Sequence, residues 1–129
     1  MAQCEWAVIC DYAFLDSRGK ACLIGIFDAI FAKKVPAIHR QATLVIQVHG
    51  KPREKLKVRI EIARPNGTSL ARIEANGELS ESGGAGLQLE LGPMNLPDYG
   101  SYACNIAIND EPDYHTRFDV REIPNAGVN

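Results

Sequence analysis

Hydrophobic and polar residues alternate along most of the chain, and this period of two predicts β-strands. The clearest case is residues 56–62, where four aliphatic side chains alternate with Lys57, Arg59 and Glu61. No stretch has the apolar spacing of an amphipathic helix. We therefore expect eight or nine strands and little or no helix, with the other strands near residues 6–15, 21–28, 29–35, 43–49, 69–74, 87–91, 102–108 and 116–120.

Residues typical of turns separate these strands, and one turn predicts how the first two strands pair. The turn at Asp16–Gly19 joins the first two strands as a hairpin. It places Cys22, Ile24 and Ile26 beside Phe14, Tyr12 and Cys10, on the face that Trp6 and Val8 share. Gly25 then falls near Asp11, where a strand glycine marks a bulge or a close backbone approach. We expect loops at residues 36–40, a loop or short edge strand within 75–86, and a frayed tail at 124–129.

Residues 98–104, Asp-Tyr-Gly-Ser-Tyr-Ala-Cys, have the form of a tyrosine corner. In that arrangement the Tyr102 hydroxyl bonds back to nearby backbone, Gly100 permits a sharp turn, and Asp98 can hydrogen-bond its own turn. Together with the strand spacing, the corner predicts one domain over residues 1–129. Its fold class is an all-β, antiparallel, immunoglobulin-like β-sandwich.

The charge and the cysteine content indicate which class of partner and which compartment to expect. The 129 residues carry a net charge of −2, without the basic excess typical of nucleic-acid binders. The basic alternation across residues 51–59 fits the wet face of one strand, or a patch for phosphate or an acidic partner. Without a signal peptide or a membrane-length apolar run, we expect a cytoplasmic protein with reduced thiols. In an oxidising compartment, Cys22 and Cys104 would be the leading disulfide pair.

The sequence offers little for catalysis. The three histidines lack a second ligand at metal spacing, and no G-x-S-x-G motif is present. The glycine-rich run at 82–86 lacks the Lys-Ser/Thr ending of a phosphate-binding loop. We therefore predict no catalytic residue, no metal and no cofactor. One polar cluster stands out, either as backbone caps and ion pairs or as a small pocket: Asp11, Asp28, His39 and Arg40.

The segment 27–32 carries apolar residues on both strand faces, so one face needs a cover other than the core. Phe27, Ile30 and Phe31 are the candidate interface. We expect a non-enzymatic binding or assembly module with a protein partner or a homo-oligomer, and with neither nucleic acid nor membrane. Two alternatives stay open: a small-ligand or enzymatic pocket at the polar cluster, and an extracellular or virion-type adhesive sandwich.

Four segments resemble a family of small bacterial proteins known by a domain-of-unknown-function label. They are residues 8–13, 19–20, 23–28 and 36–39. The resemblance implies a bacterial, cytoplasmic, immunoglobulin-like sandwich with no established activity and no catalytic residues. A true immunoglobulin domain matches less well, because Trp6 lies in the first strand instead of between two core cysteines.

Overall fold

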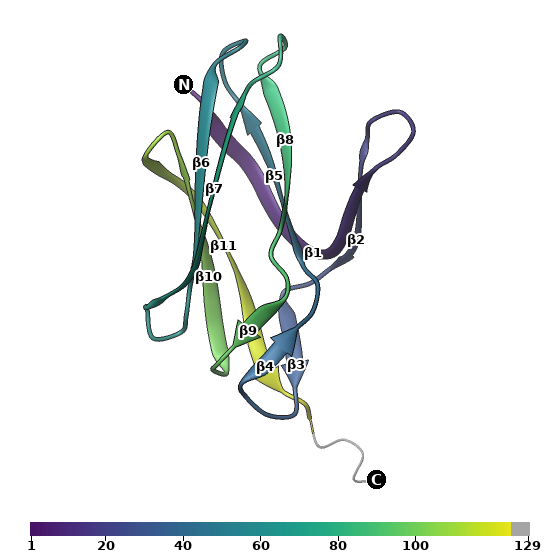
Figure 1. Ribbon diagram of the computed structural model, residues 1–129, viewed down its shortest axis with the longest axis vertical. Coiled ribbons are helices and arrows are strands. Elements are labelled where there is room, and N and C mark those ends of the chain that lie inside the picture. The colour runs from purple at the N-terminus through teal and green to yellow at the C-terminus, as the bar shows by residue number, and fades with distance from the viewer. Residues whose placement is uncertain (125–129) are drawn as a thin grey trace.

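The computed structural model describes residues 1–124, which form three sheets. Within this range lie eleven strands: β1 (Gln3–Leu15), β2 (Ala21–Ile26), β3 (Ala29–Ala32), β4 (Ala37–His39), β5 (Thr43–His49), β6 (Lys55–Ala63), β7 (Ser69–Glu78), β8 (Gly84–Glu90), β9 (Met94–Leu96), β10 (Gly100–Ile108) and β11 (Glu111–Glu122). The strand orders are β2-β1-β5-β8, β3-β11-β10-β6-β7 and β4-β9. Figure 1 shows the two larger sheets as facing layers of a sandwich.

The core lies between the inner faces of these layers. Alternate residues of β6 are buried, as the alternation predicts, and the same pattern recurs in β10. At the centre, the rings of Tyr102 and Phe118 stack with centroids 5.2 Å apart and an interplanar angle of 7°. The rings of Phe27 and Phe118 form a T-shaped pair with centroids 6.5 Å apart and an interplanar angle of 76°. These aromatic contacts join β10, β11 and the segment after β2 into one core.

Three sequence expectations need correction. Residues 36–40 and 93–97 contain the short strands β4 and β9, so the strand count exceeds nine. The segment 75–86, expected to hold a loop or a short edge strand, instead contains the end of β7, which continues to Glu78, and the start of β8. Finally, β3 pairs in parallel with β11, so the sandwich is not wholly antiparallel. Strands of three residues, such as β4 and β9, are too short to show alternation, which is why the pattern did not predict them. Of the expected frayed tail, residues 125–129 lie outside the described residues.

The tyrosine corner forms as predicted. The buried Tyr102 donates its hydroxyl hydrogen to the Asp98 carbonyl and accepts a hydrogen bond from the Asp98 N–H, both at 2.9 Å. Gly100 has a φ of 125°, and a Cβ there would lie 3.0 Å from the Pro65 ring. The Asp98 carboxylate pairs with Arg64 Nε at 2.9 Å instead of bonding its own turn. The corner therefore joins the β9–β10 loop to the β6–β7 turn.

Removing the Tyr102 hydroxyl is expected to destabilise the fold. In Tyr102→Phe, the N–H and carbonyl of Asp98 both lose their partner, and a buried unsatisfied polar group costs about 1–3 kcal/mol. Urea unfolding should show this as a lower midpoint with an unchanged slope. Tyr12→Phe is the matched control, because the Tyr12 side chain is 52% exposed. Equal shifts in the two variants would contradict a bonding role for the corner.

One hairpin extends beyond the sandwich. The strand β5 pairs with β1 only as far as Cys10, opposite Thr43. Beyond that point, residues 11–15 pair with β2 alone. We call residues 11–26 the hairpin arm. Figure 1 shows its tip standing apart from β5 and β8.

Candidate functional site

The hairpin arm exposes large apolar side chains. Within residues 1–124, five of the exposed large hydrophobic residues belong to it: Tyr12 (52%), Phe14 (47%), Leu15 (63%), Ile24 (53%) and Ile26 (65%). Single exposed apolar residues are ordinary on protein surfaces, but a contiguous group marks an interaction site. The arm is therefore the candidate functional site.

The register gathers four of these side chains on one face. Tyr12 pairs with Ile24, and Phe14 with Cys22, as the sequence predicts. Ile26 pairs with Cys10, and residues directly opposite each other in a ladder share a face. The same face of β1 carries the half-buried Trp6 and Val8, since side chains two residues apart point the same way. We call this set the apolar stripe: Trp6, Val8, Tyr12, Phe14, Ile24 and Ile26.

Charges are divided between the two ends of the arm. At the tip, Arg18 and Lys20 are exposed. The Asp16 carboxylate there accepts hydrogen bonds from their backbone N–H groups at 2.8 and 2.9 Å, which closes the turn. At the base lie Asp11, whose side chain is 48% exposed, and the exposed Asp28. The tip thus carries two exposed cations beside the Asp16 carboxylate, and the base carries two carboxylates.

Most of the interface expected at segment 27–32 is packed into the core. Ile30 is 9% exposed and belongs to the core, and Phe27 packs against it next to Phe118. Only Phe31 is open, at 53%. Pairing of β3 with β11 covers one edge of this segment and turns Ile30 inward. Of the three candidate interface residues only Phe31 is therefore exposed, whereas the neighbouring arm exposes five large apolar side chains.

The polar cluster comes together in part. His39 Nε2 lies 3.7 Å from an Asp11 carboxylate oxygen and is buried without a hydrogen-bond partner, beside the Phe27 ring at 5.3 Å. Asp28 is exposed, and its carbonyl accepts a hydrogen bond from the Asp119 N–H. Arg40 is exposed, and within residues 1–124 neither Asp28 nor Arg40 forms an ion pair. The four residues therefore do not converge on one pocket.

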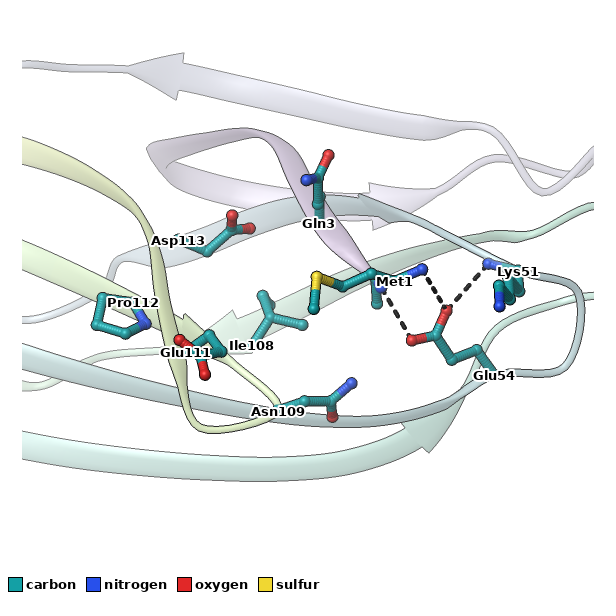
Figure 2. Close-up of a pocket in the computed structure, with 10 residues that line it drawn as sticks. Met1, Gln3, Lys51, Glu54, Ile108, Asn109, Glu111, Pro112 and Asp113 are labelled. Carbon is teal, nitrogen blue, oxygen red and sulfur yellow. Dashed lines mark hydrogen bonds and ion pairs between the residues drawn. The ribbon is translucent and has the colours of Figure 1, made fainter.

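A separate cavity of about 620 Å³ lies at the other end of β1 (Figure 2). Its wall includes Met1, Lys51, Glu54 and Asp113. The Glu54 carboxylate accepts hydrogen bonds from the backbone N–H groups of Lys51 and Ala2 and lies 3.6 Å from the Met1 amine. The Lys51 N–H is the main cause that lowers the pKa of Glu54. Glu54 is thus occupied in fastening the first residues to the sandwich.

Three of the five basic residues at positions 51–59 pair with carboxylates. Arg59 lies 3.1 Å from Asp110, which Lys57 also approaches at 3.4 Å, and Arg53 lies 2.6 Å from Glu81. These exposed pairs contribute little to stability, but they balance the local charge. The stretch fits the solvated strand face that the sequence predicted.

All four cysteines are free thiols. Cys22 lies on the arm, whereas Cys104 is buried in β10. The two cysteines considered as a disulfide pair for an oxidising compartment therefore lie in different parts of the fold. Burial raises the pKa of Cys104 to about 12. Burial, and then the charge of Asp113, raises the pKa of Cys4 to about 11. These two thiols stay protonated at neutral pH and are poor nucleophiles.

Alkylation should follow this order of burial. At pH 8, iodoacetamide is expected to label the partly exposed Cys22 first and to leave Cys104 unmodified until the protein unfolds. With a pKa of about 12, only about one Cys104 thiol in 10,000 is ionised at pH 8. Peptide mass spectrometry over time, with and without urea, measures the order. Rapid native labelling of Cys104 would contradict its place in the core.

Residues 1–124 contain no group of three or more His, Cys, Asp or Glu side chains arranged to hold a metal ion. They also contain no helix with the length and apolar character required to cross a membrane.

Comparison with known proteins identifies relatives of the fold. A model of a family of unknown function (DUF6941) matches residues 5–121, and no curated protein sequence matches the chain. The chain is similar in structure to the alkylpurine DNA glycosylase AlkC of Pseudomonas fluorescens, bound to DNA containing an abasic site analog, with 13% identity and a TM-score of 0.54. That match covers 89% of this chain but only 30% of the glycosylase chain, and it shows the fold alone.

A second similar structure is an immunoglobulin-like protein from Pseudomonas aeruginosa. It has 14% identity and a TM-score of 0.46, with 94% of this chain and 97% of that chain covered. The sheets of the structure confirm the all-β sandwich predicted from the sequence, and the family match confirms the resemblance to a family of unknown function.

Proposed function

We propose that this chain, which belongs to the family of unknown function DUF6941, is a non-enzymatic protein-binding module that binds through its hairpin arm. The observation that carries the proposal is the exposure of five large apolar side chains on one two-stranded hairpin. A hairpin of two strands is marginally stable in water, and three or more strands or a packed neighbour are needed to stabilise it. A bound protein would supply that neighbour.

The chemistry of the other candidate sites supports a binding role. Burial raises the pKa of Cys4, Cys10 and Cys104, which makes these thiols weak nucleophiles. A ligand pocket at Asp11 and His39 is the second candidate, because His39 Nε2 is buried without a partner. It has less support, since Asp28 and Arg40 do not join it. An extracellular adhesive role has no support from the four free thiols.

Site-specific photocrosslinking in the native host tests the binding role. A photoreactive amino acid replaces Ile24 on the arm or, as the matched control, Ile38 on β4, which is 69% exposed. We expect a covalent adduct with one defined protein from position 24 and none from position 38, with the partner identified by mass spectrometry. Absence of any adduct from position 24, or the same adducts from both positions, would overturn the proposal.

A further inference from the structure

We infer that the partner of the arm is a second copy of this chain, and that two arms pack antiparallel with their apolar stripes in contact. This inference rests on the proposed function and specifies its partner. A twofold axis places the same patch of each copy against the other, so the patch must complement itself. The apolar stripe meets this condition because it contains no charged residue.

The charges at the ends of the arm favour the antiparallel orientation. An arm of about five residue pairs is about 17 Å long at the rise of a β-strand. When two arms overlap over this length in opposite directions, the tip of each lies beside the base of the other. Arg18 and Lys20 of each copy then lie beside the exposed Asp28 of its partner. A parallel overlap would instead place cations against cations and carboxylates against carboxylates.

The available apolar area is sufficient for a dimer of modest affinity. Tyr12, Phe14, Ile24 and Ile26 are each about half exposed, which corresponds to about 100 Å² per side chain. Two copies therefore contribute about 800 Å² from these side chains, before the backbone and the end charges are added. A specific interface needs about 1,000 Å² in total. We accordingly expect an equilibrium between monomer and dimer in the micromolar range.

Sedimentation velocity of the purified chain over a concentration series tests the stripe. Ile24→Ser is expected to raise the dimer dissociation constant at least about tenfold, because one aliphatic contact is lost in each copy. Ile38→Ser is the matched control and should leave the dissociation constant within about twofold. Both isoleucines are exposed, at 53% and 69%, so neither change should impair folding. A wild-type chain that stays monomeric up to millimolar concentration would overturn the inference, and so would equal effects of the two variants.

Charge reversal tests the orientation and the identity of the partner together. At low salt, Arg18→Glu alone and Asp28→Lys alone should each weaken self-association, because each places like charges at both tip-to-base contacts. In an equimolar mixture, the acidic tip of the first variant faces the basic base of the second, and the unchanged Arg18 and Asp28 also meet. The mixed dimer should therefore recover to within about twofold of the wild type. No recovery in the mixture would overturn the antiparallel arrangement.

The two proposals can fail separately. If the purified chain is monomeric while position 24 still crosslinks to a different protein, the second-copy inference is wrong and the binding function stands. If position 24 yields no adduct in the host, the binding function itself is wrong.

Discussion

Replacing Phe118 with alanine is expected to lower the free energy of unfolding by about 3–5 kcal/mol. The side chain is 1% exposed and lies at the centre of the core. Its ring stacks on Tyr102 at 5.2 Å and forms a T-shaped pair with Phe27 at 6.5 Å, so truncation removes two aromatic contacts and leaves a cavity. Since small domains have total stabilities of about 5–15 kcal/mol, this loss takes a large share of the whole.

Phe31→Ala is the matched control for this prediction. The same residue type is removed, but Phe31 is 53% exposed on the edge strand β3. Its unfolding free energy should change by about 0.5 kcal/mol or less, as for other surface substitutions. Urea denaturation followed by circular dichroism measures both variants. A similar loss in both would mean that Phe118 is not the centre of the core.

The sequence predicted the fold correctly where a strand is long and half-buried. In β6 the alternation identifies the strand, its inner face and its solvent face, and the structure agrees. The tyrosine corner was readable because its hydrogen bond is local, from Tyr102 to Asp98 four residues away. Short strands were missed because three residues carry no period, and the parallel pairing of β3 with β11 depends on contacts about 90 residues apart in the chain.

For the candidate site, the sequence predicted the strand register of the hairpin arm but not the exposure of its side chains. The sequence placed Tyr12 beside Ile24 and Phe14 beside Cys22, and the ladder confirms both pairs. It could not show that these side chains are exposed, because their alternation is the same as in a core strand. Exposure is decided by where β5 stops pairing with β1, at Cys10 and Thr43. Tertiary structure, which the periodicity does not encode, therefore separates an interface strand from a core strand.

The base of the arm makes a second prediction with a large effect. Gly25 has a φ of +73°, and a Cβ at this position would lie 2.5 Å from Oδ2 of Asp11. Gly25→Ala therefore adds left-handed backbone strain to a steric clash, for an expected loss of about 2–3 kcal/mol. To relieve the clash, the Asp11 carboxylate must turn away, and its 3.7 Å approach to His39 is lost.

Gly19→Ala isolates the steric part of this effect. Gly19 lies at the tip of the same arm with a φ of +81°, but no atom would lie within 4 Å of a Cβ there. This variant should lose only about 1 kcal/mol, from backbone strain. Adding Asp11→Ala to Gly25→Ala should recover part of the loss, because the carboxylate is gone while the Cβ of residue 11, at 3.1 Å, remains. Urea denaturation of the three variants measures these losses, and no improvement in the double variant would contradict the clash. The position of the arm relative to the sandwich therefore depends on the absence of a side chain at Gly25. For this reason, Gly25→Ala should also weaken self-association more than Gly19→Ala.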